Sequence, residues 1–306
     1  MDHLLGISFS QKSLNIVSGE GASSSGPGAV FCKQFIYPFK FYYDTLFETT
    51  SIKSMVKLIR DSLNTDNPQI VIAVPNNYAV LKRVAIPDNS DVQLIKAQVK
   101  WELENTLSEP IENYKVIDYG KTYDYESYKE RMFVCLHKTI MRQIMSMVNL
   151  LGGQLQSLIL NGFAVENILE KVWQPKQITN ALYTKVDTHT ITHHLYINRA
   201  YYQTFIDKIK HEKKINAAVD KIADVILKRV KYVQAVVGEI PITKSSDLTY
   251  FLASAVYNSE LLSYMNKNAP FNYEELEPGQ FIESDQIQNQ AECHLEALGA
   301  LMEIQS

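Results

Sequence analysis

Residues 4–17 read Leu-Leu-Gly-Ile-Ser-Phe-Ser-Gln-Lys-Ser-Leu-Asn-Ile-Val, which is two apolar runs separated by Ser10-Gln11-Lys12. A polar break of this length suits a tight connection, so the stretch predicts a hairpin of two strands, Leu4 to Phe9 and Ser13 to Val17. A Gly/Ser segment comes next, and a further run of β-favouring residues extends from Ala29 to Pro38. The chain is therefore predicted to begin with a three-stranded meander.

The second half of the chain repeats this pattern. Three strand-like runs precede a long helical segment, Ile215 to Val237. The segment Pro175-Lys176-Gln177 lies before the runs and has the composition of a boundary. We therefore predict a duplicated unit, with a first lobe over residues 1–175 and a second lobe over residues 176–306. The three runs are Leu182 to Val186, Thr190 to Ile197 and Tyr201 to Ile206.

Strands and helices alternate between the two meanders, which places the protein in the α/β class. Within the first lobe, a helix is predicted after Asp88-Asn89-Ser90. It carries an apolar stripe at helical spacing, and Trp101 lies off that stripe. The tyrosine-rich stretch from Lys121 to Glu130 is expected to be an exposed connection between two strands. The stripe consists of Val92, Ile95, Val99 and Leu103.

Composition limits the functions that are open to the chain. It has 306 residues, 46% of them hydrophobic, and a net charge of −4, which is typical of a globular protein that does not bind nucleic acid. The three cysteines are far apart, which argues against disulfides and against a zinc site. No apolar run approaches the roughly 18 residues of a membrane span, and the first residues do not resemble a secretory signal. We expect a protein of the cytoplasm.

Five strings carry a family resemblance: Leu5 to Leu14, Ala85-Ile86-Pro87 with the helix up to Glu104, Ile117-Asp118-Tyr119, Gly162 to Val165, and Leu295 to Leu301. They resemble strings of the actin-like ATPase superfamily, and within it most of all the type IV pilus assembly family PilM and the related cytoplasmic domain of the type II secretion family GspL. The resemblance covers most of the chain. It implies an actin-like, ribonuclease H-like fold: two duplicated β-meander-plus-helix lobes, with a small α+β insert in the first lobe at about residues 87–130.

Three loops hold a nucleotide in that superfamily, and the resemblance implies that all three are altered here. Ser8 stands where the first hairpin of the family has an aspartate on the magnesium side, and Ser10 where it has a glycine. In the second hairpin the family's Asp-Ile-Gly corresponds to Asp187-Thr188-His189, and in the adenosine loop Ala253 and Ser254 replace glycines. A Cβ blocks the close approach of backbone N–H groups to phosphate, and a serine offers no carboxylate to Mg²⁺. We interpret these residues as vestiges of a nucleotide site and expect no cofactor.

No other constellation in the sequence indicates catalysis or a metal. A cluster of His189, His193 and His194 is present, but a strand turns the last two to opposite faces, and we interpret the cluster as a solvated sheet face. The sequence places no nucleophile beside a base, so an enzyme is not expected. Tyrosines gather at residues 37–43 and 119–128, for which a partner surface and ordinary strand packing both stay open.

The resemblance implies a non-catalytic scaffold of a pilus or secretion-type assembly, held at the inner face of the membrane by the cytoplasmic peptide tail of an inner-membrane partner. Trp101 and Tyr119 are the candidate residues lining the groove for that tail, although Trp101 could instead belong to the core. Self-association stays open. Two alternatives remain: an active actin-like ATPase or sugar-kinase-like enzyme, which would bind nucleotide, and a filament-forming cytoskeletal protein, which would pellet at high concentration.

Overall fold

The structure is a computed structural model, and its contacts divide the chain into two compact units. The first unit combines Met1–Ala164 with Ile282–Ser306, and the second is Val165–Phe281. Each unit is described by itself below. The residues that the structure describes are 3–10, 13–20, 30–36, 49–63, 67–87, 91–125, 128–187, 190–209, 215–240, 247–254, 258–281, 287–288 and 294–303.

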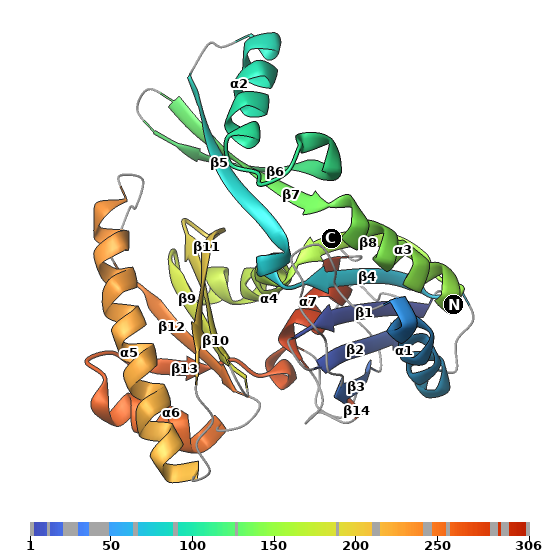
Figure 1. The fold of residues 1–306 in the computed structure, drawn as a ribbon. Helices are drawn as coiled ribbons and strands as arrows, with labels where there is room; N and C mark the ends of the chain where they lie inside the picture. The colour runs from blue at the N-terminus through green and yellow to red at the C-terminus, as the bar shows by residue number, and fades with distance from the viewer. Residues whose placement is uncertain are drawn as a thin grey trace. The chain divides into compact units, whose positions relative to one another are not determined.

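The first unit is built on a sheet with the order β14-β3-β2-β1-β4-β8 (Figure 1). The strands β1, β2 and β3 pair antiparallel as the predicted meander, and β4 and β8 continue the sheet in parallel. Apolar residues on both faces of β1 and β4 are buried, as expected for strands in the middle of a covered sheet. The strands are β1 (His3–Phe9), β2 (Ser13–Glu20), β3 (Val30–Ile36), β4 (Gln69–Val74), β8 (Gln154–Leu160) and β14 (Ile287–Gln288).

Helices cover both faces of this sheet. Figure 1 shows α1 (Thr49–Ser62) beside α3 (Lys138–Leu151), and the two helices are in contact. Each leads into a parallel strand, so both lie on one face through right-handed crossovers. The other face is packed by α7 (Leu295–Glu303), which approaches β1 so closely that a Cβ on Gly6 would overlap the Ala297 carbonyl oxygen.

The insert of the first unit is a small sheet, β5-β7-β6, with one helix on it. Ile95, Val99 and Leu103 of that helix pack on the sheet, whereas Val92 of the predicted stripe is 66% exposed because it lies at the helix start. The sheet takes in more of the chain than residues 87–130, because β5 and β7 pair along their full lengths. The elements are β5 (Ala79–Pro87), α2 (Val92–Glu104), β6 (Tyr114–Asp124) and β7 (Tyr128–His137), with 3₁₀ turns at Asn76–Tyr78 and Ile111–Asn113.

The predicted exposed connection from Lys121 to Glu130 is wrong in extent. Both strands continue through it, Thr122 opposite Arg131 and Asp124 opposite Lys129, so the turn is short. The strands continue through this stretch because Tyr123 is buried, at 3% exposure, so this part of β6 belongs to the packed structure.

The second unit repeats the strand order of the first. Its sheet runs β11-β10-β9-β12-β13, with an antiparallel meander followed by parallel strands. The long helix α5 and helix α6 share a buried apolar cluster with this sheet. Helix α4 (Asn161–Lys176) begins in the first unit and continues into the second. The other elements are β9 (Ala181–Val186), β10 (Thr190–Ile197), β11 (Ala200–Lys208), α5 (Ile215–Glu239), β12 (Thr249–Ser254), α6 (Asn258–Asn268), β13 (Tyr273–Glu275) and a 3₁₀ turn at Pro278–Gln280.

The compact units divide the chain differently from the predicted ranges 1–175 and 176–306. Pro175 lies in the last turn of α4 and marks the end of that helix. The first of the two segments that form the first unit ends earlier, at Ala164. The C-terminal residues, predicted for the second lobe, belong to the first unit because α7 packs on β1 and β4. No local pattern in the sequence indicates this return, since an apolar helix does not reveal which sheet it covers.

Candidate functional site

A row of polar side chains crosses the first hairpin at the position predicted to be a vestigial phosphate loop. Ser8 and Asn15 are each only 1% exposed and lie directly opposite each other, and Asn15 lies opposite Gln34. Asn15 Nδ2 donates to Ser8 Oγ at 3.4 Å, and Gln34 Nε2 donates to Asn15 Oδ1 at 3.2 Å. Gln34 Nε2 also lies 2.8 Å from His294 Nε2, just before α7. We call Ser8, Asn15, Gln34 and His294 the first polar row.

The tip of this hairpin is closed by its own polar groups. The Ser10 backbone N–H donates to the Ser13 carbonyl at 2.8 Å, and the two serine hydroxyls are 2.7 Å apart. The carbonyl of Phe9 accepts from Asn161 Nδ2 at 3.1 Å. All members of the first polar row are neutral or imidazole groups, so the row supplies no carboxylate to a magnesium ion.

The other predicted vestigial residues come together at one end of the second sheet. Ser254, the last residue of β12, pairs with Val186 at the end of β9, and Asp187 follows directly. The Asp187 N–H donates to the Thr190 carbonyl at 2.9 Å, which closes the start of the turn to β10. Ala253 lies one residue before Ser254 in the same strand. His189, the remaining predicted residue, lies outside the described residues.

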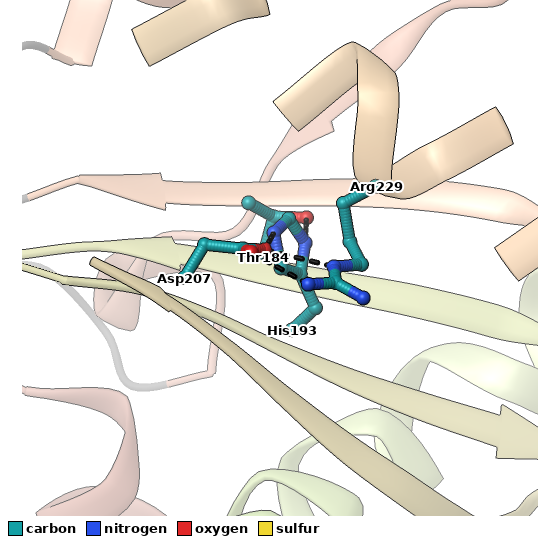
Figure 2. Close-up of polar contacts among 4 residues, drawn as sticks. All are labelled: Thr184, His193, Asp207 and Arg229. Atoms are coloured by element: carbon teal, nitrogen blue, oxygen red, sulfur yellow. Dashed lines mark hydrogen bonds and ion pairs between the residues drawn. The ribbon is translucent and has the colours of Figure 1, made fainter. Parts of the chain in front are cut away.

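A second polar row lies within the second sheet, under α5 (Figure 2). Thr184 of β9 and His193 of β10 are directly opposite and fully buried, with Thr184 Oγ1 2.9 Å from His193 Nδ1. His193 Nε2 faces Asp207 Oδ2 of β11 at 3.6 Å, which is too long for a hydrogen bond. Arg229 of α5 donates two hydrogen bonds to Asp207, from Nε to Oδ2 at 2.8 Å and from Nη2 to Oδ1 at 2.6 Å. We call these four residues the second polar row.

The environment of this row fixes its charges. Burial lowers the pKa of His193 to about 3, against the smaller opposing effect of Asp207, so the imidazole is neutral near pH 7. The hydrogen bonds from Arg229 lower the pKa of Asp207 below its usual value. Arg229 also lies over the rings of Phe205 and Tyr232, at 5.3 and 5.5 Å from their centroids.

The order of threonine, histidine and aspartate is that of a hydrolase triad, but its burial rules out that chemistry. Thr184 and His193 are both 0% exposed, so no substrate carbonyl can reach the hydroxyl. The ion pair at the other end is only partly buried, with side-chain exposures of 21% for Asp207 and 26% for Arg229. We therefore assign the second polar row a structural role in joining α5 to the sheet.

The predicted solvated histidine face is wrong, although the opposite orientation of its two members is confirmed. His193 belongs to the second polar row, whereas His194 stacks with Tyr183 and hydrogen-bonds Thr204, at 2.7 Å, on the other face. Both are buried because α5 covers one face and aromatic residues fill the other. Among the described residues no group of three histidine, cysteine or acidic side chains could hold a metal ion.

The two predicted partner-binding residues lie in different parts of the insert. Trp101 is 63% exposed, so it is not a core residue, and Leu94, one heptad earlier on α2, is 55% exposed beside it on the outer face. Tyr119 of β6 stacks on Phe163 at the start of α4, with ring centroids 4.0 Å apart and planes within 12°. The ammonium of Lys121 lies 5.8 Å from the Tyr119 ring. Tyr119 thus marks the junction of insert and lobe, and the structure does not place Trp101 in that contact.

This architecture is that of the actin-like ATPase fold, and comparison with solved structures confirms it. The chain is similar to a chain of the PilM-PilN type IV pilus biogenesis complex, with a TM-score of 0.72 and 15% identity over 98% of each chain. It is also similar to the cytoplasmic domain of EpsL, an inner membrane component of the type II secretion system of Vibrio cholerae, with a TM-score of 0.53 and 9% identity over 100% of this chain and 96% of that one. A third similar structure is a protein with an actin-like ATPase fold from Bacteroides thetaiotaomicron, with a TM-score of 0.51 and 11% identity over 98% of this chain and 96% of that one.

The resemblance to the PilM and GspL families is therefore confirmed at the level of the fold. No protein-family model matches the sequence, and no curated protein matches it. At identities of 15% and below, the likeness defines how the chain folds and leaves its activity to be argued from its own residues. Across the helices that the structure describes, none is long and apolar enough to cross a bilayer.

Proposed function

We propose that the protein is a non-catalytic scaffold of a pilus or secretion-type assembly, and that it binds the cytoplasmic tail of an inner-membrane protein. The observation that carries this proposal is the likeness of fold to a chain of the PilM-PilN complex, over 98% of both chains. The insert that would receive the tail is included in that coverage. The partner would hold the scaffold at the inner face of the membrane.

The first polar row supports the non-catalytic part of the proposal. Phosphoryl transfer depends on positioned cations and hydrogen-bond donors around the phosphates. In the first hairpin, Ser8 is buried and hydrogen-bonded within the sheet, and Ser10 is paired with Ser13, so these side chains serve the fold. We propose that the corresponding residues of the second unit, Asp187, Ala253 and Ser254, are equally vestigial.

A nucleotide-binding test separates this proposal from the ATPase and kinase alternatives. We expect millimolar ATP with Mg²⁺ to leave the melting temperature unchanged, because the first polar row has no carboxylate for the metal. A ligand at 100 times its dissociation constant would stabilise the protein by about 2.7 kcal/mol, which a thermal scan detects readily. An upward shift with ATP-Mg²⁺ but not with Mg²⁺ alone would contradict the proposal and favour an active enzyme.

The edge of the insert sheet supports an extended peptide as the ligand. In the order β5-β7-β6, strand β6 has a single described neighbour, β7. Ile117 on this edge strand is 38% exposed, and Tyr119 two residues later packs at the junction with α4. A peptide that adds a strand to β6 would gain backbone hydrogen bonds, and its side chains would meet Tyr119 and Lys121. Trp101, on the outer face of α2, is proposed as a separate contact.

Capture from detergent-solubilised membranes, with the purified full chain as bait, tests the docking site. We expect Tyr119→Ala to reduce recovery of the partner at least tenfold, and Trp101→Ala to reduce it less, because an exposed aromatic at a rim contributes less than one at a packed junction. Tyr232→Ala, which removes a tyrosine that is 53% exposed on α5, is the matched control. Circular dichroism melts of each variant separate loss of binding from loss of fold. Unchanged capture by Tyr119→Ala would contradict the site.

A further inference from the structure

The layer formed by α1 and α3 has a charge opposite to that of the whole protein. The two helices carry five cationic side chains and one acid, although the net charge of the chain is −4. All six of these side chains are exposed. The cations are Lys53, Lys57 and Arg60 of α1 and Lys138 and Arg142 of α3, and the acid is Asp61. We call this layer the basic helical face.

Helical geometry gathers the cations along two neighbouring stripes. Lys53, Lys57 and Arg60 are spaced by four and three residues, so they share one side of α1. That side is turned toward α3, because Arg60 Nη2 lies 3.7 Å from where a Cβ would stand on Gly152, the residue that ends α3. Lys138 and Arg142 are likewise one turn apart on the outer side of α3, away from its buried residues.

Apolar side chains are also exposed on the same two helices. Leu58 of α1 is 39% exposed, and Met145 and Leu150 of α3 are 40% and 38% exposed. An open hollow of about 640 Å³ follows the outer side of α3. It is lined by both cations and by apolar side chains of that helix, so it combines positive charge with apolar surface: Lys138, Met141, Arg142, Met145, Ser146, Asn149 and Leu150.

We propose that the basic helical face docks on a bilayer surface that carries anionic lipid headgroups. Charge complementarity favours anionic headgroups as the ligand. Five cations spread over two adjacent helices match an extended negative surface better than they match a single acidic side chain on a partner protein. The exposed leucines and methionine enter the headgroup region, while lysine and arginine stems reach outward past them. This contact is independent of the tail-binding site, since it uses neither β6 nor α2.

Vesicle co-sedimentation of the full-length protein tests the proposal. The probes are vesicles of 30% phosphatidylglycerol in phosphatidylcholine and vesicles of pure phosphatidylcholine. We expect the protein to sediment with the anionic vesicles at 50 mM salt, to be released at 500 mM salt, and to stay in solution with the neutral ones. Absence of sedimentation with anionic vesicles at low salt would overturn the proposal and leave an acidic protein as the occupant of this face.

A matched pair of variants locates the contact. Lys57→Glu combined with Arg142→Glu reverses two charges on the basic helical face, and Lys228→Glu combined with Lys231→Glu reverses two exposed charges on α5. Both double variants change the net charge equally. We expect the partition coefficient for anionic vesicles to fall at least tenfold for the first double variant and less than twofold for the second. Equal losses would show a non-specific effect of net charge and would also overturn the proposal.

Discussion

In the first sheet, the polar residues that cross β1, β2 and β3 are Ser8, Asn15 and Gln34, and the row ends on His294, next to α7. In the second sheet, the row across β9, β10 and β11 begins with a threonine and a histidine and ends on an ion pair with the long helix α5. The strand order of the two meanders is the same. A duplicated topology therefore does not fix which face carries the polar residues or which helix they anchor.

The helices that cover the two sheets are also packed by different means. α7 reaches β1 and the start of α4 through glycines, where backbone meets backbone, because a Cβ on Gly6 or Gly299 would overlap a carbonyl oxygen. α5 packs on its sheet through a cluster of apolar side chains and through Arg229. Contacts between backbones tolerate no added atom, whereas side-chain contacts can adjust their rotamers.

The largest expected effect is that of Gly299→Ala. The new methyl group would overlap the Ala164 carbonyl, so we expect a loss of about 3 kcal/mol or more in the free energy of unfolding, measured by chemical denaturation. The control is Gly238→Ala in α5, where a Cβ meets nothing within 4 Å. That change should stabilise the protein by about 0.5–1 kcal/mol, because alanine favours a helix interior. If both substitutions lowered the free energy of unfolding, or both raised it, the proposed difference between the backbone contacts of α7 and the side-chain packing of α5 would be contradicted.

A smaller loss is expected from cutting the ion pair of the second polar row. Arg229→Met keeps an apolar stem over Phe205 and Tyr232 but leaves Asp207 without its two hydrogen bonds. We expect it to cost about 2 kcal/mol, since the pair is bidentate and partly buried.

The matched change in the insert is Arg131→Met, which removes a surface pair with Asp118 whose side chains are 36% and 31% exposed. We expect this loss to stay below about 1 kcal/mol. Chemical denaturation of both variants measures the difference, and equal losses would show that the second polar row does not anchor α5.

The third prediction is a pH dependence of stability that arises from the second polar row. The pKa of His193 is about 3 in the folded protein and about 6.5 when unfolded, so the unfolded chain binds more protons between these values. Stability is then lost as the pH falls from about 6.5 toward 3, at up to about 1.4 kcal/mol per pH unit. Asp207, whose pKa is lowered, adds a loss of the same sign at more acidic pH.

Denaturation curves at pH 7, 6, 5 and 4 measure that slope. His193→Gln should flatten it by about 1 kcal/mol per pH unit between pH 6 and pH 4, because glutamine does not titrate. Thr184→Val removes the hydroxyl that hydrogen-bonds the His193 ring but keeps the imidazole. It should therefore lower the stability without changing the slope of stability against pH. A slope that survives in His193→Gln would assign the pH dependence to other groups.

Much of the fold could be predicted from the sequence, because it depends on local patterns. Apolar runs and helical stripes give the two meanders and the helices α2 and α5 within a few residues of their observed bounds. The polar rows could not be predicted, since they depend on which residues lie opposite each other across strands far apart in the chain. His193 and His194, set among threonines, have the composition of a solvated face, and only the observed helix and aromatic cover shows that they are buried.

The candidate site was predictable in part for a similar reason. Trp101 lies off the apolar stripe of its helix, so its exposure follows from helical spacing. The contact of Tyr119 with Phe163 joins residues 44 positions apart in sequence, in different elements, and no local pattern indicates it. The basic helical face could not be predicted either, because its charges are contributed by two helices that the whole insert separates in the sequence.

The return of the chain to its first unit also has a consequence for biosynthesis. The second unit is one continuous stretch, Val165–Phe281, so all of it is synthesised before α7 is made. The first sheet emerges earlier but lacks its covering helix until α7 has been made. The apolar surface of β1 and β4 is therefore exposed throughout synthesis of the second unit, which makes the nascent first unit a substrate for chaperones and gives a truncation before α7 a reason to aggregate.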